Sequence, residues 1–481
     1  MVEKTDGTIP TTRLPDCGIW IIVGLLFVMF YPGGMSIDSF EHLLQARNGV
    51  LGDWHPPFIA WLWRGADAVL RGPLLMVVAQ FGVFLLALRA FAKAALPGSG
   101  KWFTLATLCV PPITGILGVV WKDIWTSSLL LLAGAWLLDF EVRGAPVRVR
   151  QLICGGVALL GALLFRHNAV FAVLPLVAIV AWQRRADGRG WRALATAAGV
   201  TAAVVAGLAA AAAGINRSLT DYHQFPQQSL FIFDLAGVAV RSGRTDLLDA
   251  TAGRLPTVLR GRDSIPLEVL RAHYTPSTWT PLVFIADSPL AMTDSATEVD
   301  ALATAWVRAL REQPTAYLRH RAAVFRQVIG AHREPLFAPV YFAIPESSPD
   351  YAMVSRNFRI DTDVSPLQLR LRTAFTTLAT WTLYRPWLWL GLNLLVVAAA
   401  VSARRPAVAA IALSGLCYEL ALFFIAPSAD YRYSHWLILA TWAALGVLVA
   451  EFFPKLSGRT SPLPGAAAGE IPSAGKPQNC R

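Results

Sequence analysis

The chain has 481 residues, of which 55% are hydrophobic and only 15% are charged, and its mean hydropathy is +0.49. Soluble globular proteins carry about 25% charged residues, so the composition excludes a soluble enzyme and indicates an integral membrane protein. The net charge of +11 does not indicate a nucleic-acid partner. Most basic residues lie in short loops between apolar runs, where they orient a protein in a membrane.

The cysteines and the first apolar run bear on the compartment. Cys480 lies in the tail, the other four cysteines lie in or at the ends of apolar segments, and the polar region 216–382 contains none. No disulfide framework is therefore expected in that region. The first apolar run, at about 17–32, follows Lys4 and Arg13 and ends without a small-residue cleavage site, so we expect an uncleaved anchor.

The apolar runs predict ten transmembrane helices with both termini in the cytoplasm. The runs are found at about 17–33, 73–95, 102–120, 122–140, 151–166, 168–183, 192–215, 384–402, 407–426 and 434–453. Two of them, 151–166 and 168–183, are short for a bilayer that needs about 20 helical residues, so they form a tight hairpin or include a re-entrant segment. Every loop that this count places inside is basic, as the positive-inside rule requires. The basic residues of these inner loops are Lys93, Lys101, Arg143, Arg148, Arg150, Arg184, Arg185, Arg189, Arg192, Arg404, Arg405, Lys455 and Arg459.

The predicted fold is an all-α integral membrane protein with about ten transmembrane helices and a mainly helical extracytoplasmic domain inserted before the last three. The predicted parts are an N-terminal membrane domain (1–215) with its first outer loop at 34–72, an extracytoplasmic domain (216–382), a three-span part (383–453) and a cytoplasmic tail (454–481). The tail is rich in Pro, Gly, Ala and Ser, so we expect it to be disordered.

The extracytoplasmic domain is too long for a linker, and its apolar spacing is mainly helical. Helices are expected at 228–241, 246–255, 267–273, 296–313 and 315–332. Arg319, Arg321 and Arg326 make the last helix basic, which favours either contact with anionic lipid headgroups or a solvated face. Asp361-Thr362-Asp363 resembles the metal-binding pattern of nucleotide-sugar transferases, but nucleotide sugars are cytoplasmic, so we interpret it as a turn.

The stretch 31–64 lies between two hydrophobic segments and is rich in ionisable residues. A Gly-Gly pair ends the preceding helix and Ser36 can cap a new one at 37–47, whose apolar residues predict a helix on the membrane surface. Asp38 falls in its first turn, where the helix dipole favours a carboxylate. His55 is followed by two prolines, which stop regular structure and stiffen the chain beside an imidazole. An ordinary connecting loop with a capping acid is the alternative interpretation.

Two further outer turns carry polar residues between long apolar runs. Lys122-Asp123 is either a mutually neutralising pair that reaches the headgroups or a phosphate-binding lysine beside an oriented acid. Arg166-His167-Asn168 has no loop around it, and the planar fork of an arginine suits phosphate or carboxylate, so this group predicts an anionic ligand.

The last two spans add an acid and another arginine. Glu419 interrupts the ninth span about 10 Å below its outer end, where a carboxyl is either neutral or paired, with Arg432 or Arg166 as the available cations. The polar turn from Asp430 to Tyr433 follows it. Ionisable residues at the outer ends of separate hairpins indicate function, because burial there is costly.

This pattern suggests one site for a phosphate-bearing lipid, and it resembles the GT-C superfamily of multi-span glycosyltransferases, which use polyprenyl-phosphate sugars. The resemblance rests on Asp38 after the first span, the surface helix and the His55-Pro56-Pro57 run, and it covers about 17–453. Many members carry paired acids in the first loop, whereas Ser39 follows Asp38 here. The branch that it resembles is an uncharacterised bacterial one.

The resemblance implies that a sugar moves from a polyprenyl-phosphate donor to an acceptor hydroxyl at the extracytoplasmic face, with inversion. Asp38 is then the catalytic base, and Lys122, Arg166 and Arg432 bind the donor phosphate. The supporting residues are His55, Asp123, His167, Asn168, Glu419, Asp430 and Tyr433. The resemblance implies no certain cofactor, and a divalent metal ion stays an open alternative.

The expected partners are the lipid-linked donor, a glycan, lipid or protein acceptor, and membrane lipids, and the expected location is a bacterial inner membrane. A transporter or flippase for an anionic lipid or lipid-linked glycan is the alternative function. It would need a polar pathway into the cytoplasmic half, where the spans hold almost no ionisable residues beyond Arg89 and Asp139 near their ends. A structural subunit of a cell-envelope complex is the third interpretation, and it leaves the outer-face clustering unexplained.

Overall fold

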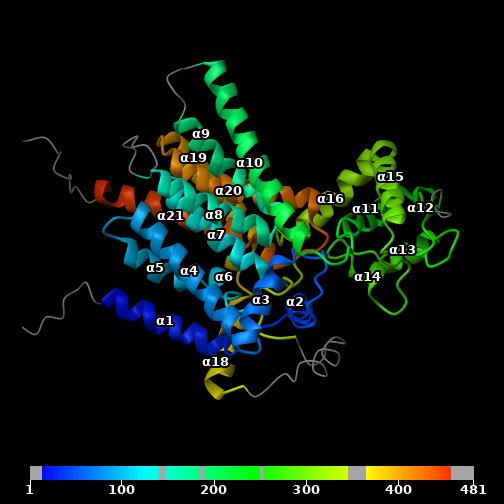
Figure 1. The fold of residues 1–481 in the computed structure, drawn as a ribbon, viewed down its shortest axis with the longest axis horizontal. Helices are drawn as coiled ribbons and strands as arrows, with labels where there is room; N and C mark the ends of the chain where they lie inside the picture. Colours follow the sequence, from blue (N-terminus) through cyan, green and yellow to red (C-terminus); the bar gives the residue numbers. More distant parts are fainter. Residues whose placement is uncertain are drawn as a thin grey trace, which may run out of the picture.

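The computed structural model describes residues 14–138, 140, 148–184, 190–249, 254–344 and 364–456. Across these ranges the regular elements are helices, joined by a few isolated β-bridges (Figure 1). In the first half they are α1 (Leu14–Phe30), α2 (Ile37–Asn48), α3 (Phe58–Val69), α4 (Leu74–Ala95), α5 (Gly100–Leu108), α6 (Pro111–Thr114), α7 (Lys122–Leu137), α8 (Val149–Phe165), η1 (His167–Ala169), α9 (Val170–Gln183) and α10 (Trp191–Leu219).

In the second half they are α11 (Gln228–Ser242), α12 (Asp246–Asp249), α13 (Leu267–His273), α14 (Thr280–Val283), α15 (Ala296–Glu312), α16 (Pro314–Val328), α18 (Pro366–Leu378), η3 (Thr382–Tyr384), α19 (Pro386–Ser402), α20 (Pro406–Ile425), η4 (Tyr431–Ser434) and α21 (His435–Leu456).

The helices form a bundle and a lobe, each with its own apolar core. The bundle core is built from α1–α10 and α18–α21, and α7 lies deep within it between α4 and α8. The lobe, which we define as α11–α16 with their connections, projects from one end of the bundle (Figure 1). Leu422 and Ala426, at the end of α20, join the lobe core, so the two cores meet there.

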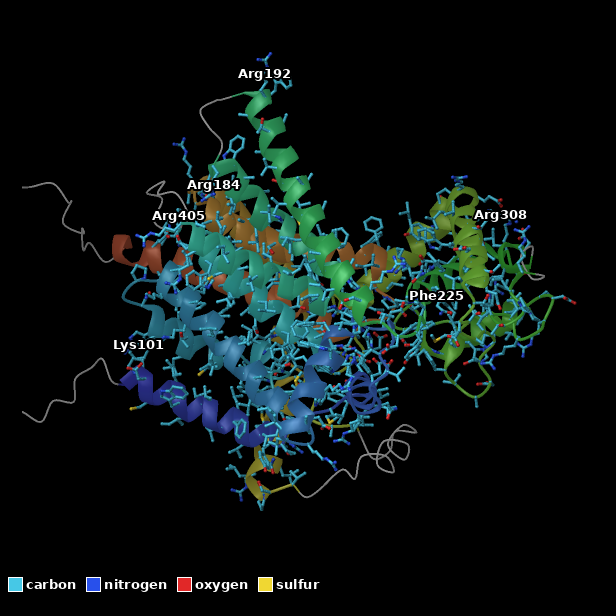
Figure 2. The ribbon with its side chains drawn as sticks, viewed as in Figure 1. Lys101, Arg184, Arg192, Phe225, Arg308 and Arg405 are labelled. Carbon is cyan, nitrogen blue, oxygen red and sulfur yellow. The ribbon has the colours of Figure 1, made fainter. Side chains whose placement is uncertain are left out.

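Within the described ranges, four helices are long and apolar enough to cross a membrane: α4, α10, α20 and a segment that comprises η4 and most of α21. Shorter apolar helices lie at α1, α8, at η1 with α9, and at α19. Lys101, Arg184, Arg192 and Arg405 lie away from the lobe, which carries Arg308 (Figure 2). The predicted topology requires such a basic end, and the count of ten spans stays a prediction.

The predicted span 102–120 is not one helix. It divides into α5 and the short α6, and residues 115–121 are not helical. Pro111 and Pro112 explain the break, because proline lacks the N–H group that a helix interior needs. The buried carbonyls of Leu117 and Val119 accept hydrogen bonds of 2.6 and 2.7 Å from the Gln80 side chain.

The first outer loop is more ordered than predicted. Ser36 caps α2, as expected, and its hydroxyl is in a capping box with Ser39. The prediction that α2 rests on the membrane surface through its apolar residues is wrong for Phe40 and Leu43, which are buried. These side chains belong to the bundle core, and α2 packs against α3. The helix α3 begins directly after the two prolines, within the stretch 34–72 that the sequence predicts as a loop.

The lobe helices follow the predicted periodicity closely. The helices α11, α13, α15 and α16 start within one residue of their expected positions, and α16 ends at Val328. Arg321 corrects the prediction of a basic face on α16, because its side chain is fully buried and its Nη2 lies 2.7 Å from Asp234 Oδ1. The Asp361-Thr362-Asp363 turn lies outside the described residues, as do Asp139 and the tail beyond 456, and α21 continues past Pro454.

Candidate functional site

Six ionisable side chains from four separate parts of the chain meet where the bundle adjoins the lobe. We call them the ionic cluster. They are Asp38 of α2, Lys122 and Asp123 of α7, Arg166 between α8 and η1, Asp430, and Arg432 of η4. All six were singled out in the sequence, and the structure brings them together.

Hydrogen bonds outside the cluster explain why the start of α2 meets the start of α7. Trp121 donates its indole N–H to the Ser36 hydroxyl over 2.7 Å, and the Ser39 hydroxyl donates to the Val120 carbonyl over 2.9 Å. The capping residues of α2 are therefore fixed to the two residues that precede Lys122. Ser39, which occupies the place of a second acid, has a structural role.

Asp38 is surrounded by three nitrogen groups. Its Oδ2 lies 2.8 Å from Arg432 Nη2 and 3.6 Å from both Lys122 Nζ and His55 Nε2. Burial alone would raise the pKa of Asp38, but Arg432, His55 and Lys122 together hold that pKa well below its usual range. The carboxylate is therefore ionised at neutral pH, while a quarter of its side chain stays exposed.

Arg432 connects three carboxylates. Its Nε lies 2.8 Å from Asp430 Oδ2 and 3.8 Å from Asp123 Oδ2, in addition to the contact with Asp38. The guanidinium also lies 4.8 Å from the centroid of the Trp121 ring, which favours a cation. A buried cation needs such partners, because an unpaired charge is costly to bury.

Asp123 and Arg166 form a direct ion pair on the other side of the cluster. Asn168 accepts a hydrogen bond of 3.2 Å from Arg166 Nε, and the Tyr433 ring lies 4.7 Å from the guanidinium. These contacts fix the planar fork. Lys122 and Asp123 are both buried and pair with other residues, so the alternative of a mutually neutralising pair at the headgroups is wrong.

His55 links Lys122 to the carboxylates. Its Nδ1 lies 2.7 Å from Lys122 Nζ. Because an ammonium group can only donate, Nδ1 accepts and the ring proton is placed on Nε2, which faces Asp38. Burial and the charge of Lys122 lower the pKa of His55 to about 4, so the ring is neutral at pH 7.

Glu41 is a member of the site that the sequence analysis did not select. It lies one helical turn after Asp38, its Oε2 is 3.9 Å from His55 Nε2, and 31% of its side chain is exposed. Burial and the charge of Asp38 raise the pKa of Glu41 to about 7. The sequence signal for Glu41 is its position three residues after Asp38, a spacing that places both side chains on the same face of the helix.

Two of the predicted supporting residues lie elsewhere. The His167 side chain is exposed and makes no hydrogen bond or ion pair within the described part of the chain. Glu419 is fully buried and accepts a 2.8 Å hydrogen bond from the Ser434 hydroxyl, with no ion pair to a described residue. Of the two alternatives predicted for Glu419, neutral or paired with Arg432 or Arg166, the described residues do not show the pair, because both cations are engaged by aspartates.

The arrangement can bind an anion and accept a proton. Lys122 and Arg432 meet at the partly exposed Asp38, and Arg166 lies on the other side of the cluster against Asp123. An entering phosphate could take over the hydrogen bonds of these cations. Among the described residues, no three His, Cys, Asp or Glu side chains are placed to hold a metal ion.

Comparisons of the chain with family models, with curated proteins and with solved structures found no match.

Proposed function

We propose that the protein is a membrane glycosyltransferase that moves a sugar from a polyprenyl-phosphate donor to an acceptor hydroxyl. The observation that carries the proposal is the ionic cluster. It combines three cations suited to a lipid phosphate with a partly exposed carboxylate, at the end of a bundle whose helices are long and apolar enough to cross a membrane.

The proposed reaction is one displacement at the anomeric carbon. The acceptor oxygen forms the new C–O bond while its proton passes to Asp38, and the bond between the anomeric carbon and the phosphate oxygen breaks. The electron pair leaves on the phosphate, which gains a negative charge that Lys122, Arg166 and Arg432 stabilise. Attack on the face opposite to the phosphate inverts the anomeric configuration.

Donor binding would also prepare the base. Before the donor binds, Arg432 contacts Asp38 directly and makes it a weak base. A phosphate that draws Arg432 toward itself would weaken this contact and raise the basicity of Asp38. His55 would keep its Nε2–H directed at the carboxylates because Lys122 occupies its other nitrogen.

The test is transfer by the purified full-length protein in detergent, supplied with synthetic polyprenyl-phosphate hexoses and a panel of hydroxyl acceptors. We expect release of polyprenyl phosphate together with a glycosylated acceptor, both measured by mass spectrometry. Proteoliposomes that move the lipid-linked sugar between leaflets without breaking its glycosidic bond would instead support the flippase alternative. Loss of product on Asp38→Asn, but not on Asp53→Asn, would connect the activity to the cluster.

A further inference from the structure

A long apolar groove lies on the bundle between α9, α10 and the α19–α20 hairpin. It has a volume of about 1030 Å³ and it extends from Val170, at the start of α9, to Arg404 and Arg405, between α19 and α20. Apart from Thr201 and these two arginines, the described residues that line it are apolar. A cavity with so few polar groups is not a good site for ordered water.

The groove exists because α10 stands away from its neighbours. In Figure 1, α10 projects beyond the end of α9. Most residues of α10 are not buried by the rest of the protein. Its groove face is made of small side chains, including Ala198, Ala202 and Ala206, which leave the space unfilled. Apolar chains in this space would regain the dispersion contacts that the facing helices lack.

The cationic end of the groove indicates the occupant. Arg405 is engaged by the carboxylate of Glu451 and donates a 2.6 Å hydrogen bond to the Phe140 carbonyl. The Arg404 side chain is exposed and has no hydrogen-bond or ion-pair partner among the residues that the structure describes. Figure 2 shows Arg184 and Arg405 on the side of the bundle away from the lobe, with Arg192 at the tip of the projecting α10, so this side of the bundle favours an anionic headgroup.

The backbone of Arg404 supports a role for its side chain. Its φ is +55°, and the next residue, Arg405, donates its backbone N–H to the Ala400 carbonyl over 2.8 Å. This is the helix-ending geometry that favours glycine, so an arginine there is strained.

We propose that the groove binds one anionic phospholipid from the leaflet at the basic end of the bundle. Its acyl chains lie between α9, α10 and α20, and its phosphate is bound by Arg404. Its phosphate end is distinct from the ionic cluster, because the 20 residues of α20 separate Arg404 from the turn that carries Asp430 and Arg432 by about 30 Å. The inference does not depend on the proposed glycosyl transfer.

Native mass spectrometry of the purified full-length protein tests the proposal, with phosphatidylglycerol, phosphatidylcholine of the same acyl chains and a polyprenyl phosphate as probes. We expect the first phosphatidylglycerol to bind about tenfold more tightly than phosphatidylcholine, because only its headgroup has a net negative charge. Arg404→Gln should remove that preference and Arg404→Lys should keep most of it. The matched control is Lys93→Gln, an exposed cation of α4 that does not line the groove.

A second pair of variants tests the position of the acyl chains. Ala202→Trp fills the groove and should abolish the tight phosphatidylglycerol site, whereas Ala203→Trp, an exposed neighbour outside the groove lining, should not. Equal binding of the two phospholipids, or tight phosphatidylglycerol binding that survives both Arg404→Gln and Ala202→Trp, would overturn the proposal. It would also be overturned if Ala202→Trp removed polyprenyl-phosphate binding alone, because the groove would then hold an isoprenoid tail.

Discussion

Asp38→Asn is the most direct test of the base assigned to the site. The substitution keeps the size of the side chain, and Ser36 rather than Asp38 caps α2, so the start of the helix should remain. The asparagine oxygen can still accept a hydrogen bond from Arg432, which lies 2.8 Å from the present carboxylate. What the variant loses is the negative charge and the ability to take a proton.

The two interpretations of Asp38 predict different magnitudes. Arg432 keeps Asp430 at 2.8 Å and Asp123 at 3.8 Å in the variant. The buried Lys122 loses its ion pair with Asp38 and keeps its contact with His55. The stability loss should therefore be about 1–3 kcal/mol, the range for a buried polar group that loses a partner. A positioned base contributes about 10²–10⁴-fold in rate, or roughly 3–5 kcal/mol of barrier. A structural carboxylate would leave the rate within a few-fold of wild type.

The assay is turnover of a synthetic donor supplied in excess, together with the thermal unfolding midpoint of each purified protein. Asp53→Asn is the matched control, because Asp53 belongs to the same loop and contacts His223 and the backbone N–H of Gln224 instead of the cluster. It should change turnover only mildly. An Asp38→Asn protein that folds and retains more than about a tenth of wild-type turnover would refute the reasoning and return Asp38 to a structural role.

Three further predictions concern the anion site, the topology and pH. Arg166→Ala and Arg432→Ala should each weaken donor binding about 10–100-fold, since each removes a charge-assisted hydrogen bond. The substitution of the exposed Arg319 by alanine should not weaken it. Unchanged lipid-phosphate binding in the Arg166 and Arg432 variants, at normal protein levels, would reject the site. A periplasmic reporter fused after Leu255 should be active, and a cytoplasmic signal there would contradict the shared outer face. The raised pKa of Glu41, about 7 against an ordinary 4.5, favours folding below pH 4.5, and this advantage is lost as pH rises through 7. Glu41→Gln should therefore raise the unfolding midpoint relative to wild type at pH 8 more than at pH 5, and an equal difference at both would refute the assignment.

Local periodicity and capping predicted much of the helical structure. The helices α2, α11, α13 and α15 follow from apolar spacing together with boundary residues such as Ser36 and Ser295, whose hydroxyls accept backbone N–H groups. The membership of the ionic cluster was also largely predictable, because ionisable groups at the ends of apolar runs have few places to lie except against one another.

The pairing within the site was not predictable, because it depends on which hairpins become neighbours. Glu419 lies at the depth in its span that suits a partner of Arg432, but the Arg432 guanidinium contacts Asp38 and Asp430 instead. Arg321 shows the same problem in the lobe, since its partner Asp234 lies 87 residues earlier in the chain. Spacing along one helix cannot show that a distant carboxylate will neutralise a buried arginine.

Hydropathy predicted the wrong helix boundaries in two places where prolines determine the backbone. The run 102–120 is apolar throughout, but its two prolines divide it and free the carbonyls that Gln80 binds. The helix α3 was missed for the opposite reason, because the prolines that stop one element also stand directly before the next one. An averaged apolar score is insensitive to both effects.

Hydrogen bonds from the lobe fix the position of the loop that contains Arg432. Arg321 is fully buried, contacts Asp234 of α11, and donates a 2.8 Å hydrogen bond to the carbonyl of Ala426 at the end of α20. Three residues later, Ala429 donates its backbone N–H to the Ser277 carbonyl over 2.7 Å. The chain that leads into η4 is therefore fixed to the lobe on both sides of Pro427, and the position of Arg432 depends on it.

The lobe also holds the loop that delivers His55. Asp221, in the segment that leads from α10 into the lobe, accepts a 2.8 Å hydrogen bond from the Leu51 backbone N–H. The rings of Trp54 and the lobe's Trp279 stack with centroids 5.8 Å apart. One body therefore positions both the histidine and the arginine that face Asp38. Because a catalytic group must be held within about 0.5 Å of its working position, two loops from opposite ends of the chain need a common support, and the lobe supplies it. This makes the lobe a part of the site, although all six members of the ionic cluster lie outside α11–α16.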